Sequence, residues 1–386
     1  MFDFEDRLDL GPYATFLPNK NVPLYNWLYY KEGYSKEIVE FLAKEFGLKE
    51  GNLILDPFCG VGTTLIAAKE LGLNSIGFDV NTVALFAAKA KCPNYDVEKL
   101  KDAIKIMMRA RFSKINFKVE MPVVNKAFSK YTLEDIYFFK KKILEEFEDE
   151  KVRDFLILAL INTSTKCTYA EKQGGCITIN KKRHIPPFRP MFRKVALRMI
   201  KGYERFVKDA NEKAIDLESV SASVQRGDAR QLPLEENSVD AIITSPPYLN
   251  KIEYTNVYAI EQYLFFGQPS RPAVRSFIGE QSNKPTEDVF EGKHALPEIA
   301  KPYFYDMNLA LQEMYRVLKK GCKAGIVIGN GCFPEQVIQS DELLAELAEK
   351  AGFTVEKILV LNKRWCMKDR VFKVGTLRES LLILEK

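Results

Sequence analysis

The sequence predicts an α/β protein whose mostly parallel, doubly wound sheet is interrupted by a mostly helical insertion. Short apolar segments typical of strands alternate with helical segments before about residue 91. Helical patterns then fill the stretch between Cys92 and Ser221, and strand-like segments return after it. Alternating strands and helices are typical of a parallel sheet covered on both faces, so the break in the middle indicates an insertion.

The first half of the predicted sheet lies near the start of the chain. Ser35 is expected to cap an amphipathic helix that ends near Gly47, because serine caps helices and glycine ends them. A strand, a helix, a second strand and a second helix follow at residues 52–56, 63–71, 75–79 and 80–90. This β-α-β-α order predicts neighbouring parallel strands.

The middle and the end of the chain complete the architecture. Helical patterns occur at residues 100–110, 132–147, 152–163 and 191–211. Strands are expected at 222–226, 239–244, 323–329, 354–361 and 380–384, with helices at 303–318 and 341–351. We therefore divide the chain into residues 1–94 with the first half of the sheet, the insertion 95–220, and residues 221–386 with the second half.

The composition fits a soluble protein with a full hydrophobic core. Of 386 residues, 46% are hydrophobic, and 57 Lys and Arg against 52 Asp and Glu leave a net charge of +5. This charge permits a polyanionic partner without predicting one. The seven cysteines form no C-x-x-C pair, so we expect neither a disulfide framework nor a zinc site, and a reducing, cytoplasmic setting. No segment has the pattern of a signal peptide or a membrane span.

A glycine-rich turn follows the first predicted strand. The segment DPFCGVGTT spans Asp56 to Thr64 and opens the next helix. Gly60 and Gly62 allow a tight turn close to a ligand, and the free amides of a helix N-terminus can bind a carboxylate. The segment lacks the G-K-[ST] ending of a phosphate-binding loop and the third glycine of the nicotinamide fingerprint. It predicts a nucleoside-type cofactor site, and an ordinary glycine turn is the alternative.

Two acidic residues follow neighbouring strands. Asp79 ends the second predicted strand, where its carboxylate can accept hydrogen bonds from both hydroxyls of a ribose. The alternative is that Asp79 caps the next helix, and the two roles are compatible. Asp228 follows the strand at 222–226, where it can accept a hydrogen bond from an adenine amino group.

The segment TSPPY, Thr244 to Tyr248, directly follows the apolar strand VDAIIT. A proline-rich turn after a strand is common, yet these residues also suit chemistry on a cytosine amino group, whose delocalised lone pair is a poor nucleophile. Acceptors at the Ser245 side chain and at the Ser245 or Pro246 carbonyl would hold both amino hydrogens and aim the lone pair at a methyl donor. Pro246 and Pro247 would rigidify these carbonyls, and Tyr248 offers a face on which an extruded base stacks.

Together, DPFCGVGTT and TSPPY resemble the motif pair F-x-G-x-G and [DNS]-P-P-[YF] of the S-adenosylmethionine-dependent nucleic-acid amino-methyltransferases. MYRVLKKGCKAGIVIGN, residues 314–330, resembles the helix and strand that follow in that fold. The resemblance covers residues 50–90 and 222–386. It implies a Rossmann-like class I methyltransferase fold with S-adenosylmethionine as cofactor. The implied cofactor residues are Asp56, Phe58, Cys59, Gly60, Gly62, Thr63, Thr64 and Asp79, with Asp228 near the adenine.

The resemblance also implies the reaction. It assigns Ser245, Pro246, Pro247 and Tyr248 to the pocket for the target base, and serine in the first position is typical of the branch that methylates N4 of cytosine. We expect direct methyl transfer, because the Pro-Cys order of enzymes that attack cytosine covalently does not occur in the sequence. Methylation of adenine N6, or nucleic-acid binding without activity, are the alternatives.

The insertion contains a basic stretch, Lys172 to Tyr203, without any acidic residue. We expect nucleic acid to bind here, because lysines and arginines neutralise phosphates and aromatic rings stack on bases. The predicted contact residues are Lys181, Lys182, Arg183, Phe188, Arg189, Arg193 and Lys194. A solvated basic helix face is the alternative. The isolated histidines His184 and His294 predict no metal site.

Two nucleic-acid substrates are compatible with these motifs. The insertion separates the two motifs, an order that resembles enzymes in which a target-recognition region lies between them. A helical insertion with one basic stretch and no separate recognition domain favours a folded RNA, such as ribosomal RNA. Methylation of a short DNA site is the alternative.

Overall fold

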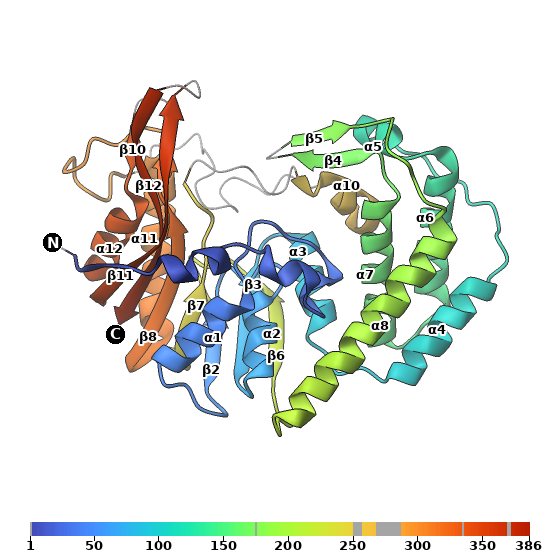
Figure 1. The fold of residues 1–386 in the computed structure, drawn as a ribbon, viewed down its shortest axis with the longest axis horizontal. Coiled ribbons are helices and arrows are strands. Elements are labelled where there is room, and N and C mark those ends of the chain that lie inside the picture. The colour runs from blue at the N-terminus through green and yellow to red at the C-terminus, as the bar shows by residue number, and fades with distance from the viewer. Residues whose placement is uncertain (1, 174–175, 250–256, 268–286, 334–335, 369–371) are drawn as a thin grey trace.

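The computed structural model contains an eight-stranded, mostly parallel sheet with helices on both faces (Figure 1). It describes residues 2–173, 176–249, 257–267, 287–333, 336–368 and 372–386. The strand order is β1-β11-β12-β8-β7-β2-β3-β6. These strands are β1 (Phe4–Asp6), β2 (Leu53–Asp56), β3 (Asn74–Asp79), β6 (Ala222–Arg226), β7 (Val239–Thr244), β8 (Leu318–Gly329), β11 (Thr354–Lys368) and β12 (Phe372–Glu385). The predicted α/β, doubly wound fold is confirmed.

The strand order reverses at β2, and this reversal positions the site. β2 is parallel to both of its neighbours, β3 and β7, and β7 is parallel to β8. β12 runs antiparallel to β8 and to β11. In doubly wound sheets, ligands bind outside the carboxyl ends of the strands at the point of reversal. The ends of β2, β3 and β7 are therefore the expected place for a ligand.

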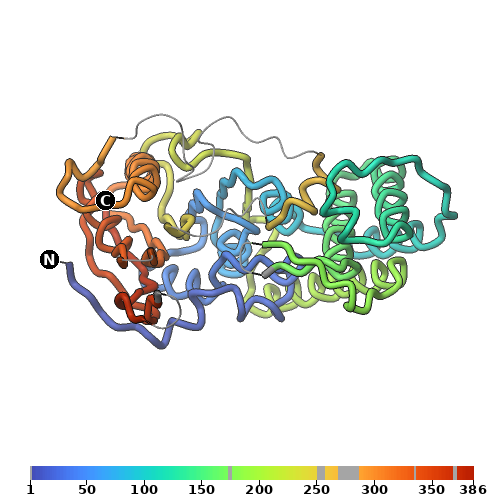
Figure 2. Tube along the Cα trace, turned by 90° about the horizontal axis from the view of Figure 1, so that it is seen from above, coloured from blue at the N-terminus to red at the C-terminus, as the bar shows by residue number. Residues whose placement is uncertain are grey.

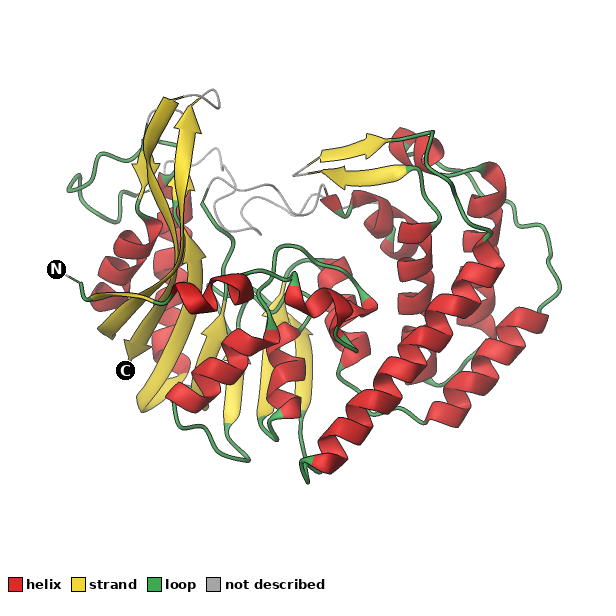
Figure 3. Ribbon diagram, viewed as in Figure 1, coloured by secondary structure: helices red, strands yellow, loops and turns green. Residues whose placement is uncertain are grey.

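Helices cover both faces of the sheet (Figure 3), and alternating side chains of the central strands are buried beneath them. The helices that accompany the sheet are α1 (Lys36–Glu45), α2 (Thr63–Glu70), α3 (Thr82–Lys91), α11 (Lys301–Val317) and α12 (Ser340–Ala351). Ile54 of β2 and Ile243 of β7 pack in one cluster with α1. Leu55 and Ile242 belong to a second cluster with α11 and α12. Successive strand side chains point to opposite faces, so these apolar runs need helices on both sides.

The insertion packs beside the sheet and shares a hydrophobic cluster with it. Its helices are α4 (Val97–Arg109), α5 (Pro122–Ala127), α6 (Lys130–Glu146), α7 (Glu150–Lys166) and α8 (Phe188–Glu212). It also contains a hairpin that the sequence analysis did not predict, β4 (Ala170–Gln173) and β5 (Cys176–Ile179). Val83 and Ala87 of α3 belong to the same buried cluster as Phe155 of α7. Figure 2 shows the insertion helices grouped at one end of the molecule.

The two ends of the insertion are tied to each other. Asn94 Nδ2 donates a hydrogen bond to the Leu217 carbonyl at 2.9 Å. The Tyr95 N–H donates to the Tyr203 hydroxyl at 2.8 Å, and the two rings are in edge contact with centroids 5.4 Å apart. The chain therefore leaves the sheet and returns to it at neighbouring points.

Helix α1 is capped by Asn19 rather than by Ser35. Ser35 has the extended backbone of an N-cap residue, but its hydroxyl donates to the Thr15 carbonyl at 2.5 Å. Asn19 Oδ1 accepts from the Lys36 N–H at 3.2 Å, and Asn19 Nδ2 donates to the Tyr34 carbonyl at 3.1 Å. The predicted capping interaction was wrong because a buried residue 17 positions earlier supplies the oxygen.

Cys332 and Cys366 form a disulfide, with their Cα atoms 5.9 Å apart. Cys332 lies on the short strand β9 (Gly331–Cys332), which pairs with β10 (Val337–Ile338), and Cys366 lies on β11. This pair differs from the expectation of unpaired thiols. The cysteines are 34 residues apart and only the fold brings them together, so their spacing gave no sign of the bond.

Arg378→Met should lower the free energy of unfolding by about 3–5 kcal/mol, because it leaves a buried carboxylate without its partner. Asp341 is fully buried and accepts from Arg378 Nε at 2.8 Å and from Ser380 Oγ at 2.8 Å. Denaturant unfolding followed by circular dichroism measures the loss. Lys363→Met removes an exposed pair with Asp6 and serves as the control, with an expected loss below about 1 kcal/mol. Equal losses in the two variants would contradict this account.

Candidate functional site

The glycine-rich turn joins the end of β2 to the start of α2. Gly60 has a φ of 51° and Gly62 a φ of 81°, a left-handed conformation that favours glycine. Gly62 is the N-cap of α2, and a Cβ at this position would lie 3.0 Å from the Cβ of Ala88 on α3. Glycine therefore permits both the turn and the close packing of two helices, and it places the N-terminus of α2 at the end of β2.

Asp79 holds the turn from the neighbouring strand. Its Oδ2 accepts from the Gly60 N–H at 2.8 Å, and its Oδ1 accepts from the Asn81 N–H at 2.7 Å. Asn81, not Asp79, caps α3, by accepting from the N–H groups of Val83 and Ala84 at 3.1 Å. Burial raises the pKa of Asp79, and the backbone N–H bonds oppose this shift. A carboxylate has about four acceptor positions, so Asp79 retains capacity for ribose hydroxyls.

Asp56 connects the two sequence motifs. Its Oδ1 accepts from the Thr244 hydroxyl at 2.6 Å and from the Phe58 N–H at 3.1 Å, and its Oδ2 accepts from the Thr64 hydroxyl at 2.5 Å. Asp56 is 3% exposed and Thr64 is fully buried, so these two predicted cofactor residues lie beneath the turn and support it. Burial raises the pKa of Asp56 to about 6, although the hydroxyl bonds act in the opposite direction.

Tyr34 completes the support under the turn, and the sequence analysis gave it no role. It is buried, and its hydroxyl lies 2.5 Å from Thr64 Oγ1. The same hydroxyl donates to the Ile243 carbonyl at 3.3 Å and contacts Asp56 Oδ2 at 3.4 Å. The segment before α1 is thus fixed to both β2 and β7.

Tyr30 covers the turn from the outside, and it too was missed. A Cβ on Gly60 would lie 3.3 Å from the Tyr30 ring. Tyr30 stacks on Tyr258, with ring centroids 5.2 Å apart and planes at 20°, and the Tyr258 hydroxyl donates to Glu32 Oε2 at 3.0 Å. Aromatic residues are dense at positions 25–34, which could have indicated a role for this segment. Their spacing has neither helical nor strand periodicity, so no helix or strand was predicted there.

The other predicted cofactor residues of the turn differ in exposure. Cys59 is 5% exposed and Thr63 is 7% exposed, whereas Phe58 is half-buried. Burial raises the pKa of Cys59 well above its ordinary value, so the thiol stays protonated and is not a nucleophile. Phe58 is therefore the side chain among these three that is accessible to a ligand.

The predicted base-pocket residues directly follow β7, and they are Ser245, Pro246, Pro247 and Tyr248. Pro246 is buried, and the other three are partly exposed. The Tyr248 hydroxyl donates to Glu379 Oε1 on β12 at 2.9 Å. Its ring lies against the backbone of Gly329 on β8, where a Cβ would come within 2.7 Å of the ring. β8, the neighbour of β7, and β12, the next strand of the sheet, therefore hold Tyr248 in place.

The carboxylate of Asp228 is already engaged within the protein. It pairs with Arg230 at 2.6 Å, and Arg230 also pairs with the buried Asp306 at 2.9 Å. The Gly227 N–H donates to the Asp79 carbonyl at 3.3 Å, which places Asp228 beside the end of β3. Its contact with an adenine stays a prediction.

Part of the basic stretch belongs to the core of the insertion. Phe188 is 5% exposed and Phe192 is fully buried, and both rings contact Phe139 edge to face. The expectation that Phe188 stacks on a base was wrong, because its ring, like that of Phe192, fills the interior between helices. Arg189 pairs with Asp135 at 3.1 Å, so its charge is balanced within the insertion.

The remaining predicted contact residues lie at the surface or near it. The exposed ones are Lys181, Lys182, Arg193 and Lys194. Lys181 Nζ lies over the Tyr169 ring at 4.3 Å, and Arg183 is half-buried and donates to the Ala170 carbonyl at 3.2 Å. Their contact with nucleic acid stays a prediction.

The histidines do not form a metal site. His184 is exposed, and His294 Nε2 lies 2.8 Å from Glu346 Oε2. Across the described ranges, no group of three or more His, Cys, Asp or Glu side chains is arranged to hold a metal ion. In the same ranges, no helix combines the length and the apolar character needed to cross a membrane.

The arrangement fits S-adenosylmethionine, the cofactor that the resemblance implies. The N-terminus of α2 presents backbone N–H groups suited to the methionine carboxylate. Asp79 has acceptor capacity suited to the ribose hydroxyls, and Phe58 offers a half-buried ring. These three groups lie at the ends of adjacent parallel strands, where the sheet reverses its order.

Asp56 should make the stability decrease as the pH rises through about 6. The folded state holds a proton on Asp56 up to about pH 6, whereas the ordinary pKa is 3.8. Between these values the folded state binds more protons, so the free energy of unfolding falls with rising pH. Asp56→Asn removes this titration. The free energy of unfolding of the wild type, relative to that of Asp56→Asn, should therefore decline from about pH 4 to 7. A difference between the two proteins that stays constant over this range would contradict the raised pKa of Asp56.

Comparisons with known proteins agree with this site. The model of a family described as DNA methylase matches residues 27–90, which include Tyr30, Asp56 and the glycine-rich turn. Type II methyltransferase M.BsoBI of Geobacillus stearothermophilus is 29% identical over 445 residues, covering 97% of this chain and 87% of the relative.

Two further relatives have the same kind of name. Type II methyltransferase M.AvaI of Nostoc sp. is 27% identical and covers 90% of this chain and 83% of the relative. Type II methyltransferase M.MjaII of Methanocaldococcus jannaschii is 35% identical over 139 residues, which cover 33% of this chain and 26% of the relative. The family match and these relatives confirm the resemblance to the S-adenosylmethionine-dependent amino-methyltransferases of the N4/N6 family that the sequence motifs indicated.

Proposed function

We propose that the protein transfers a methyl group from S-adenosylmethionine to the N4 amino group of cytosine in DNA. One observation carries this proposal. Thr244, at the start of the TSPPY segment, donates to Asp56, at the start of the glycine-rich turn, at 2.6 Å. A cytosine held by TSPPY would therefore lie next to the cofactor turn, because β7 and β2, which end in these two segments, are adjacent parallel strands.

The reaction requires the protein to orient a weak nucleophile, the N4 amino nitrogen of cytosine. S-adenosylmethionine, when bound, supplies the methyl group. Ser245 is partly exposed at the end of β7, where its hydroxyl and its carbonyl can accept the two amino hydrogens of cytosine. The prolines restrict the backbone that carries these carbonyls. Holding both hydrogens directs the nitrogen lone pair toward the methyl donor and contributes through orientation.

The Tyr248 ring is suited to hold an extruded base. Its hydroxyl is fixed to Glu379 and its ring rests on Gly329, so the ring is positioned before the substrate arrives. Stacking on a fixed aromatic ring contributes about 1–3 kcal/mol per base. Cys59, the cysteine of the turn, is buried and protonated, which supports direct transfer without an enzyme nucleophile.

The proposed polymer is DNA, and the proposed base is cytosine. The family description names DNA, and none of the comparisons supports the RNA preference of the sequence analysis. Ser245 in the first position of the tetrapeptide supports cytosine N4 over adenine N6. We also propose that residues 95–220 recognise the substrate, because Lys182, Arg193 and Lys194 are exposed there.

A methyl-transfer assay tests the proposed function. Plasmid DNA and total RNA are offered in parallel with S-adenosylmethionine labelled in its methyl group, and the products are digested to nucleosides. We expect label in N4-methyldeoxycytidine. Label in N6-methyldeoxyadenosine would overturn the choice of base, and label in RNA alone would overturn the choice of polymer.

Ser245→Ala and Tyr248→Ala should both impair methylation, by different routes. Loss of Ser245 should lower the single-turnover rate at saturating DNA by about tenfold or more, the effect of about 1.4 kcal/mol in the transition state. Loss of Tyr248 should chiefly weaken DNA binding, because stacking is lost. Asp79→Ala is the contrasting variant. It should weaken S-adenosylmethionine binding in calorimetry, whereas the Ser245 and Tyr248 variants should not. If Ser245→Ala and Tyr248→Ala methylate at wild-type rates, the pocket is assigned wrongly.

A further inference from the structure

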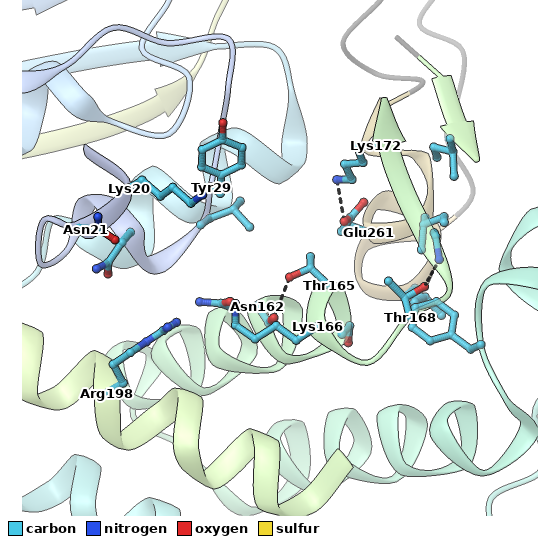
Figure 4. Close-up of a pocket in the computed structure, with 18 residues that line it drawn as sticks. Lys20, Asn21, Tyr29, Asn162, Thr165, Lys166, Thr168, Lys172, Arg198 and Glu261 are labelled. Atoms are coloured by element: carbon cyan, nitrogen blue, oxygen red, sulfur yellow. Dashed lines mark hydrogen bonds and ion pairs between the residues drawn. The ribbon is translucent and has the colours of Figure 1, made fainter. Parts of the chain in front are cut away.

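A second pocket lies on the insertion side of the molecule, away from the TSPPY segment. Its volume is about 400 Å³, within the size range of small-ligand sites. The segment before α1, the end of α7, strand β4 and helix α10 (Ala259–Glu261) contribute side chains to its wall, and α8 contributes Arg198. Figure 4 shows Lys20, Asn21 and Arg198 at one end, Lys166 on the floor, and Lys172 beside Glu261 at the other end.

The threonine hydroxyls of this pocket already have partners within the protein. Thr165 Oγ1 donates to the Asn162 carbonyl at 2.8 Å, and Thr168 Oγ1 donates to the Ala127 carbonyl at 2.9 Å. The Asn162 side chain donates to the Trp27 carbonyl at 2.7 Å. These groups serve the fold, so a ligand would have to use other donors.

Three cationic side chains of the pocket, by contrast, have no such partners in the described part of the chain. With respect to the described residues, Lys20, Lys166 and Arg198 form neither an ion pair nor a side-chain hydrogen bond. Burial lowers the pKa of Lys166, and the nearby charges of Arg198 and Arg183 lower it further. Uncompensated positive charge of this kind, in a partly enclosed site, attracts an anion.

Glu261 gives the other end of the pocket a different character. It is 4% exposed, and its Oε1 lies 2.7 Å from Lys172 Nζ, which neutralises its charge. Its Oε2 is buried and has no hydrogen-bond partner among the described residues. A buried carboxylate oxygen without a donor is costly, so this end suits a ligand that brings an N–H group.

We infer that this pocket holds one nucleotide of the substrate strand, with its phosphate on Lys166 and Arg198 and an exocyclic amino group of its base donating to Glu261. The inference rests on the proposed function, because it takes the ligand to be part of the nucleic-acid substrate. A nucleotide combines an anion with an N–H-bearing edge, which matches the two ends of the pocket. Carboxylates accept from base amino groups in direct readout, so the contact would contribute to sequence preference.

The pocket is connected to the cofactor turn through packed side chains. Lys172 Nζ, which pairs with Glu261, lies 3.8 Å from the centroid of the Tyr258 ring. Tyr258 stacks on Tyr30, and Tyr30 covers Gly60. Lys172, Tyr258 and Tyr30 therefore connect Glu261 to the turn, and the nucleotide bound at Glu261 would belong to the same strand of nucleic acid as the target base.

The phosphate contact is tested by salt dependence. The probe is a duplex that carries the site methylated by the wild-type protein, and fluorescence anisotropy gives Kd over a series of KCl concentrations. Lys166→Met and Arg198→Met should each weaken binding about tenfold or more at low salt. Each should flatten the slope of log K against log salt by about 0.7–0.9, and the double variant should flatten it no further, because both contact one phosphate. Lys208→Met, an exposed cation of α8 outside the pocket, should leave Kd and slope unchanged.

The base contact is tested with duplexes in which one base at a time lacks its amino group. Purine replaces adenine, hypoxanthine replaces guanine and 2-pyrimidinone replaces cytosine. Removing the amino group at one base position should weaken binding to the wild-type protein about tenfold. The same removal should not weaken binding to the Glu261→Met/Lys172→Met protein, in which both members of the buried ion pair are replaced. Glu261→Gln provides a second variant if that protein unfolds.

Different results would contradict the proposed function and the inference about the pocket. If the wild-type protein does not methylate DNA, the proposed function fails before any pocket variant is made. If the wild-type protein methylates DNA but the salt slopes of the Lys166 and Arg198 variants match the wild type, the inference is overturned. It is also overturned if no base position couples to Glu261.

Discussion

The hydrogen bonds to Asp56 are the interaction on which the rest of the site depends. One buried carboxylate receives hydroxyl groups from β7 and from α2, and a backbone N–H from the turn itself. A carboxylate in this position is costly unless its acceptor positions are used, and Thr64, Thr244 and the Phe58 N–H supply the donors. The cofactor turn and the base pocket thus share one structural support, which fixes their separation.

The same support determines how the chain before α1 is placed. Tyr34 binds Thr64 under the turn and Asn19 caps α1, so the chain before α1 is fixed at two points. Tyr30 then lies over Gly60 and meets Tyr258, which follows the base pocket in sequence. The cofactor turn is consequently connected to Lys172 of the insertion through Tyr30 and Tyr258, although these residues are far apart along the chain.

The sheet and the glycine-rich turn could be predicted from sequence, because each depends on local pattern, and the base pocket stays a prediction. The apolar run before Asp56 and the glycines after it are constrained by backbone geometry within a few residues. The roles of Asn19 and Tyr34 depend on partners distant in sequence, and so does the pairing of Cys332 with Cys366. The strand pair β4 and β5 was missed because β4, with the sequence AEKQ, is polar and lacks a strand-like pattern. Phe188 and Phe192 are four positions apart, a helical core spacing that was outweighed by the surrounding charges.

The bond between Asn94 and Leu217 has a consequence for how such proteins diversify. Because the insertion begins and ends at neighbouring points, its length and its helices can change without moving β3 or β6, the strands that flank it. A shorter or unrelated segment joined at the same two points would leave the parallel strands in register. The proposed recognition module can therefore be exchanged in evolution while the sheet and the residues at the ends of its strands are kept.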